Sequence, residues 1–219
     1  LQRMISTGLK LALMIGSAAA VGMGLLSHQI LRLLYASQPE NCLELGGQLL
    51  AIMSVGVLFL AVVQTTTGML QGLGKPSYPV KTLLVGIVAK TVLNYVLIGI
   101  PQINVLGAAI ATVVCYAIAA LGNVYMVLKL SKTKLKPVDA LVRPALAVGG
   151  MGAAVWGFVR LMGGRLGNTM LTLGAVCLGV LVYAVLAFVL RALSKEDLAL
   201  IPGGRRVARL MDKLGGKKA

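Results

Sequence analysis

Long runs without a charged residue are the feature that most constrains this chain. They cover residues 11–31, 45–74, 103–128 and 166–190. A helix needs about 20 apolar residues to cross the hydrocarbon core of a bilayer, so each run is long enough to span it. Of the 219 residues, 58% are hydrophobic and 12% are charged, which indicates an integral membrane protein rather than a soluble domain. The short alternating segments of a membrane β-barrel are absent from the sequence.

The sequence predicts an all-α integral membrane fold with about six transmembrane helices. Their expected bounds are 9–34, 45–70, 78–100, 103–128, 141–162 and 169–190. Arg143 and Arg160 flank the uncharged part of the fifth, and both side chains are long enough to reach the interfaces. The expected domains are a four-helix part at 1–130, a basic cytoplasmic loop at 131–143, two additional transmembrane helices at 144–193 and a basic cytoplasmic tail at 194–219.

The net charge of +15 is distributed unevenly along the chain. Most of the 21 Lys and Arg residues fall on one side of the six expected spans or in the tail, so the positive-inside rule places both ends of the chain in the cytoplasm. Nucleic acid is not an expected partner, because aromatic residues are sparse and no nucleic-acid motif is present. After the break at residues 202–204, the tail is expected to form either a short helix on anionic membrane lipids or a frayed basic segment.

Polar residues share one face of the second expected span. Gln64, Thr67, Gly68 and Gln71 are spaced at i, i+3, i+4 and i+7. Lipid penalises exposed amides, so this face is expected to point at protein or water. It has two interpretations: hydrogen bonds between helices, or the lining of a substrate cavity.

Lys90 lies about ten residues from each end of the third expected span, with no acidic residue near it. A charge at this depth costs about 2.5–3.5 kcal/mol on insertion scales and usually faces a bundle interior or a wet cavity. Gly86, Lys90 and Asn94 are spaced by four, so the lysine and the amide could hold a phosphate or a sugar hydroxyl. In the alternative interpretation, carbonyls or amides of neighbouring helices, such as that of Gln64, satisfy Lys90.

The sequence contains no set of residues that indicates catalysis, a metal site or a cofactor. All six acidic residues lie outside the span centres, and Cys42, Cys115 and Cys177 are far apart. Cys115 and Cys177 are expected to be small buried residues. Two stripes of small residues, one in the fourth span and one in the fifth, are expected to pack against other helices: Ala108, Thr112, Cys115, Ala119 and Gly122, and then Gly149, Ala153 and Gly157.

A series of short motifs occurs in a fixed order along the chain: Leu70-Gln71-Gly72-Leu73-Gly74-Lys75-Pro76, Pro79-Val80-Lys81, Lys90, Asn94, Pro101 and Gly107-Ala108-Ala109-Ile110-Ala111-Thr112. In this order the chain resembles the C-terminal part of polysaccharide-type flippases of the multidrug/oligosaccharidyl-lipid/polysaccharide superfamily. It is most similar to the stage V sporulation protein B group, which is related to the lipid II flippase. The opening stretch at 9–35 and the segment at 196–202 also resemble this family.

The resemblance implies most of the second lobe of a MATE-like fold plus two additional C-terminal helices. In the family those two helices are thought to form a groove for a lipid tail. The first lobe is expected as a partner in the same or another chain. Gln71, Lys90 and Asn94 match family positions. Gln64, Thr67, Gln71, Lys90 and Asn94 together are the candidate cavity-lining or substrate-binding residues.

The expected function is that of a bacterial plasma-membrane flippase, not an enzyme. By alternating access it would move a polyprenyl-pyrophosphate-linked saccharide for synthesis of the cell wall or spore cortex. One alternative is a cation-coupled multidrug exporter of the same superfamily. Another is a truncated membrane scaffold without transport activity.

Overall fold

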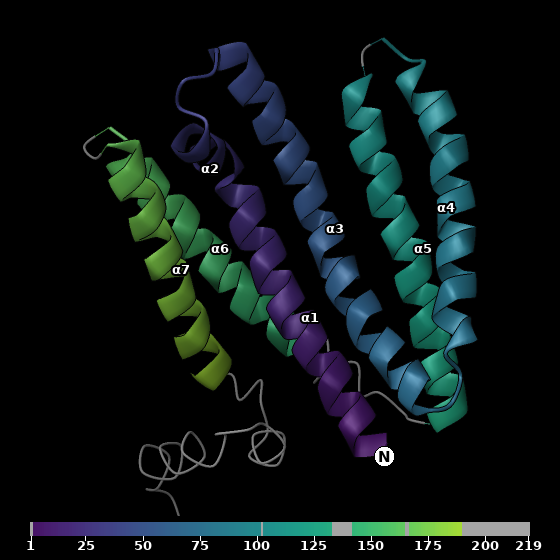
Figure 1. Ribbon diagram of the computed structural model, residues 1–219. Helices are drawn as coiled ribbons and strands as arrows, with labels where there is room; N and C mark the ends of the chain where they lie inside the picture. The colour runs from purple at the N-terminus through teal and green to yellow at the C-terminus, as the bar shows by residue number, and fades with distance from the viewer. Residues whose placement is uncertain (1, 102, 133–141, 165–166, 190–219) are drawn as a thin grey trace, which may run out of the picture.

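A computed structural model describes residues 2–101, 103–132, 142–164 and 167–189 of the chain (Figure 1). Within these ranges all the regular structure is helical: α1 (Gln2–Leu25), α2 (Ser27–Leu34), α3 (Glu40–Gly72), α4 (Ser77–Ile98), α5 (Val105–Ser131), α6 (Arg143–Met162) and α7 (Asn168–Val189). In the described ranges, six of these helices are long and apolar enough to cross a membrane, which confirms the predicted all-α fold and its six spans. The basic segment at 133–141 and the tail at 194–219 lie outside the described residues.

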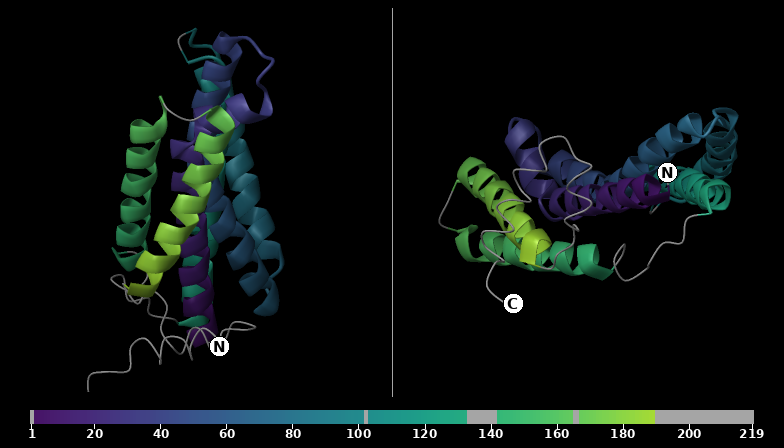
Figure 2. Two further views of the ribbon diagram at one scale, coloured as in Figure 1. Left: turned by 90° about the vertical axis from the view of Figure 1, so that its left-hand side faces the viewer. Right: turned by 90° about the horizontal axis from the view of Figure 1, so that it is seen from below.

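The spanning helices follow one another in a curved row instead of closing into a bundle (Figures 1 and 2). Helices α1 and α3 pack along each other at the centre. The α4–α5 hairpin packs on α3 through α5, and the α6–α7 hairpin packs on α1, mainly through α6. Consequently, much of the surface of the outer helices, above all α4, faces away from the rest of the chain.

Glycines allow close approach at each junction of the row. Across the α1–α3 junction, a Cβ added at Gly16 would meet the Cβ of Ala61 at 3.0 Å and the backbone of Leu58 at 3.4 Å. Within the α4–α5 hairpin, a Cβ added at Gly86 would meet the carbonyl oxygen of Cys115 at 2.7 Å. In lipid, association between helices depends on close van der Waals packing rather than on hydrophobic burial, so these contacts hold the row together.

The first span differs from its predicted form. The sequence predicts one helix over 9–34, but α1 begins at Gln2, ends at Leu25 and is followed by the short helix α2. Leu26, between them, has φ −100° and ψ 11°. Gly22 and Gly24 precede the bend, and glycine is the weakest helix former other than proline. Lys10 is buried within α1 at 9% exposure.

Two further expectations are corrected. The second span, expected to begin at residue 45, begins earlier, because α3 starts at Glu40, directly after Pro39. An acidic residue in the first turn suits the positive end of the helix dipole, and Glu40 also pairs with Arg32 at the end of α2. Cys115 is buried as predicted, whereas Cys177 is exposed on α7.

Substitution at Gly86 tests the close packing of the hairpin. We predict that Gly86→Ala lowers stability, because the added methyl group meets a backbone carbonyl that cannot rotate away, and overpacking costs about 1–3 kcal/mol. Gly68→Ala is the control, since nothing lies within 4 Å of an added Cβ there and alanine favours the helix. In detergent, the melting temperature should fall for Gly86→Ala and rise for Gly68→Ala. Equal shifts of the two melting temperatures would contradict close packing at Gly86.

Candidate functional site

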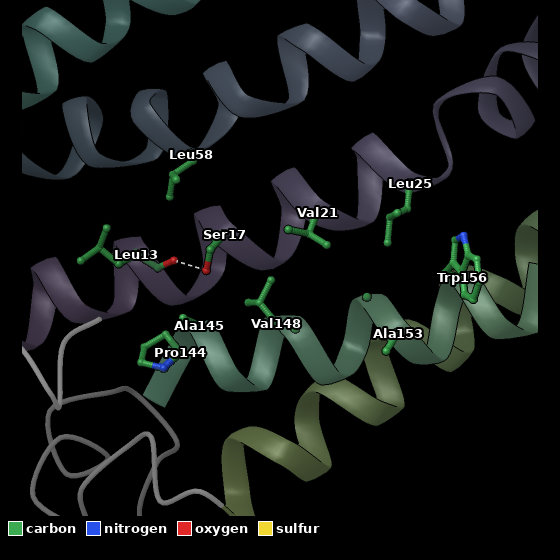
Figure 3. A pocket seen from close by; sticks show the side chains of 12 residues that line it. Leu13, Ser17, Val21, Leu25, Leu58, Pro144, Ala145, Val148, Ala153 and Trp156 are labelled. Atoms are coloured by element: carbon green, nitrogen blue, oxygen red, sulfur yellow. Dashed lines mark hydrogen bonds between the residues drawn. The ribbon is translucent and has the colours of Figure 1, made fainter. Parts of the chain in front are cut away.

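An apolar groove of about 650 Å³ lies between α1 and α6, with Leu58 of α3 at its edge (Figure 3). Pro144 is at one end and Trp156 at the other. The residues that line it are Leu13, Ser17, Val21, Leu25, Leu58, Pro144, Ala145, Val148, Gly149, Gly152, Ala153 and Trp156.

The groove offers hydrocarbon surface and no free hydroxyl. Ser17 is the one hydroxyl residue in its lining, and its Oγ donates to the carbonyl oxygen of Leu13 at 2.5 Å or of Met14 at 3.2 Å. The lining runs from Leu13 to Leu25 on α1 and from Pro144 to Trp156 on α6, which is twelve steps along each helix. At 1.5 Å per residue this corresponds to about 18 Å, more than half the thickness of the hydrocarbon core. The groove therefore has the length and polarity to hold an extended hydrocarbon chain.

The stripe of small residues predicted to pack in the fifth span has a different role. Gly149 and Ala153 line the groove, and an added Cβ at Gly149 or Gly157 would meet nothing within 4 Å. Close packing occurs instead at neighbouring positions of α6, where Gly150 meets Leu186 of α7 and Gly152, also in the groove lining, meets Val21 of α1. The small residues at 149 and 153 keep space open rather than fill it.

The polar face predicted on α3 is present, and most of it is uncovered. Gln64, Gly68 and Gln71 are exposed, and Thr67 is half-buried. Of these residues, Thr67 bonds to another helix, because its Oγ1 accepts from Nδ2 of Asn123 on α5 at 3.4 Å. Gln64 and Gln71 form no hydrogen bond with other described residues.

Lys90 and Asn94 lie at the edge of the α4–α5 interface, since Gly86, one turn earlier on the same face, contacts Cys115. Both are partly buried. The Oδ1 atom of Asn94 is buried with no hydrogen-bond partner among the described residues. Lys90 has neither an ion pair nor a bond to Gln64 in the described part of the chain. Among the described residues, Lys90 is therefore a cation without an ion pair, and Asn94 has a buried carbonyl oxygen without a hydrogen-bond partner.

Asn123 is a central polar residue that the sequence reasoning missed. It is fully buried on α5; its Oδ1 accepts from Oγ1 of Thr82 on α4 at 2.6 Å, and its Nδ2 donates to Thr67 on α3. One amide thus connects three helices, next to the polar face of α3. The signal in the sequence is an asparagine within an apolar span, at the end of the small-residue stripe and one residue beyond Gly122.

The described residues contain no cluster of three or more His, Cys, Asp or Glu side chains. Their two carboxylates, Glu40 and Glu44, lie in the first turns of α3. The structure brings Thr67 to Asn123 but places Lys90 and Asn94 on a separate helix that hardly contacts α3. The candidate residues therefore form two separate polar surfaces, and the apolar groove lies on the other side of the central pair.

Replacing Asn123 tests the three-helix connection. We predict that Asn123→Ala lowers stability by about 0.6–1.7 kcal/mol, from the average to the maximum found for hydrogen bonds between membrane helices. Thr91→Val is the control: Thr91 is exposed and its hydroxyl bonds only to the Ile87 carbonyl of its own helix. Thermal unfolding in detergent measures the stability of both variants. If Asn123→Ala is no less stable than Thr91→Val, Asn123 does not stabilise the contact of the three helices.

Comparison with known proteins gives a match to the MatE family over residues 1–96. MatE proteins are transporters of the superfamily that the motifs resemble. The chain is also 26% identical over 214 residues to the uncharacterized membrane protein YabM of Bacillus subtilis, an alignment that covers 94% of this chain and 38% of YabM. It is 33% identical over 104 residues to the probable multidrug resistance protein YpnP of the same organism, covering 48% of this chain and 23% of YpnP.

The chain thus spans less than two fifths of the length of these relatives. The six apolar helices among its described residues and its membrane-protein relatives support a multi-pass membrane protein. Over its first 96 residues the chain is similar to the MatE family.

Proposed function

We propose that this chain is part of a bacterial flippase that moves a polyprenyl-pyrophosphate-linked saccharide across the plasma membrane. The apolar groove between α1 and α6 is the observation that carries the proposal. Its lining is almost entirely hydrocarbon, and it extends over about 18 Å of helix. Such a groove suits a lipid chain, because its apolar lining allows van der Waals contact along the chain and leaves no unpaired polar group against it. A small soluble drug does not need a slot of this length.

The polar part of the substrate is assigned to α3 and α4. Lys90 supplies a positive charge for pyrophosphate, and Asn94 supplies an unused carbonyl oxygen for a sugar hydroxyl. Gln64, Thr67 and Gln71 are proposed to line a second polar surface of the water-filled path, on α3, since exposed amides are costly against lipid. Charge-assisted hydrogen bonds contribute about 1.5–3 kcal/mol each, enough to select an anionic head group.

The open row of helices suits one half of an alternating-access transporter. A second lobe, in the same or another chain, is proposed to face the polar surfaces of α3 and α4 and to enclose the path. The distribution of basic residues supports a cytoplasmic position for both ends of this chain, where the tail would bind anionic membrane lipids. A role in cell-wall or spore-cortex synthesis, and special similarity to the stage V sporulation protein B group, belong to the same proposal.

A cation-coupled multidrug exporter is the second candidate, favoured by the similarity to YpnP. Intramembrane carboxylates are the usual sites for coupling cations and cationic drugs. Among the described residues, the carboxylates lie in the first turns of α3 and the central ionisable residue of α4 is a lysine. This charge pattern favours an anionic substrate over a cationic one.

Filling the groove tests the proposed binding of a lipid chain. We predict that Gly149→Leu reduces photo-crosslinking of a polyprenyl pyrophosphate disaccharide, with a diazirine on its chain, by about tenfold, because the leucine side chain occupies space that the lipid chain needs and a loss of about 1.4 kcal/mol in binding is a factor of ten. Gly157→Leu is a matched control, because it also adds a side chain into open space on α6 but does not line the groove. Equal labelling of the two variants would exclude the groove as the lipid site.

Removing the charge of Lys90 tests the polar path. In the native protein, Lys90→Ala is expected to lower transport of the lipid-linked saccharide by about tenfold or more, with membrane insertion unchanged, because one charge-assisted bond is lost. Lys81→Ala, which removes an exposed lysine near the start of the same helix, should transport normally. Full complementation by Lys90→Ala would leave this lysine with a structural role only.

A further inference from the structure

The end of the groove at Trp156 carries a positive charge. The guanidinium carbon of Arg160 lies 5.0 Å from the centroid of the Trp156 ring, and Trp156 itself lines the groove at the end away from Pro144 (Figure 3). Arg160 is one turn further along α6 and is exposed. A cation is therefore held directly beyond the hydrocarbon lining.

Arg160 differs from the other described arginine at this end of the spans. Arg32 is paired with Glu40, whereas Arg160 has no carboxylate partner in the described part of the chain and is held by the tryptophan ring. Stacking on an aromatic face fixes the plane of a guanidinium group and leaves its N–H donors at the edge free. Those donors can form two parallel hydrogen bonds with a phosphate.

The depth of this pair matches that of a lipid phosphate. By the charge distribution, this is the end of the spans that we propose to be external, where basic residues are scarce. Tryptophan rings concentrate at the membrane–water interface, which is also the level of lipid phosphates. A hydrocarbon chain lying in the groove would reach its head group beside Trp156 and Arg160.

We propose that Arg160, held by Trp156, binds the phosphate or pyrophosphate of a lipid whose chain occupies the groove. The inference rests on the proposed function and adds to it a head-group site on the external side, separate from Lys90. The shared chemistry is an anionic phosphate ester on a long hydrocarbon chain. Its source is either a polyprenyl carrier or an ordinary anionic phospholipid.

Trp156 gives a direct measurement, because it is the single tryptophan of the chain. The purified chain is reconstituted into vesicles containing dibrominated phosphatidylglycerol or dibrominated phosphatidylcholine, whose bromines quench tryptophan on contact. We predict that the anionic lipid competes for the site roughly fivefold better than the zwitterionic one, the effect of one basic residue near an anionic surface. Arg160→Gln should reduce this ratio to about one, and Arg160→Lys should retain only part of it.

Arg32→Gln is the matched control, since it removes an arginine from the same side that already has a carboxylate partner and should keep the full ratio. Each ratio compares the two lipids in the same variant, so a difference in tryptophan fluorescence intensity between variants does not affect it. Circular dichroism confirms that each variant is folded. A ratio of about one in the parent chain, or an unchanged ratio in Arg160→Gln, would overturn the proposal.

A competition step identifies the source of the phosphate. Unbrominated polyprenyl pyrophosphate is added to vesicles of dibrominated phosphatidylglycerol. If fluorescence recovers far more than the mole fraction of polyprenyl pyrophosphate in the vesicles accounts for, a polyprenyl carrier is the ligand. If the recovery is only proportional to that mole fraction, the ligand at this site is an ordinary anionic phospholipid. If the proposed function alone fails, the polyprenyl probe labels the parent and Gly149→Leu equally, while the anionic preference set by Arg160 persists.

Discussion

Close approach of α1 and α3 is the interaction on which the rest of the row depends. Helices in lipid gain little from hydrophobic burial, so they associate where small residues let their surfaces touch. Gly16 brings the backbone of α3 against α1, and Thr66 on α3 is fully buried. At one end of the pair, Leu9, Leu70 and Val127 form a core that also fixes α5. Each hairpin is then attached to one member of this pair.

The groove is a consequence of how the second hairpin is attached. Helix α6 contacts α1 closely at Gly152, and Tyr183 of α7 donates to the carbonyl oxygen of Met14 at 2.9 Å. Asn168 donates to the carbonyl oxygen of Gln29 at 3.1 Å. Between these attachments, Gly149 and Ala153 are too small to close the space, so an apolar slot remains. The row thus separates an apolar surface at α1 and α6 from polar groups on α3 and α4.

Hydropathy predicted the six spans because an uncharged run of the required length has few alternatives to a membrane helix. The helix ends were less predictable: Gln2 and Glu40 extend helices into polar sequence, and the bend at Leu26 lies within an apolar run. The polar face of Gln64, Thr67 and Gln71 was found from its spacing, because helical periodicity places these residues together.

Tertiary relations were not predictable in the same way. The stripes at Cys115 and at Gly149 look alike in sequence, yet the first packs against Gly86 and the second borders open space. Which side of a helix receives a neighbour depends on the order of helices in the row. Asn123 was missed for this reason, since its role requires Thr67 and Thr82 to meet it from two other helices.

The most direct test of a lipid chain in the groove is native mass spectrometry of the protein released gently from its source membrane. We predict that the parent protein retains one long-chain lipid phosphate and that the groove-filled Gly149→Leu variant loses it. If neither protein carries a lipid, or both retain it to the same extent, the groove does not bind the substrate and the proposed transport of a lipid-linked saccharide loses its structural basis.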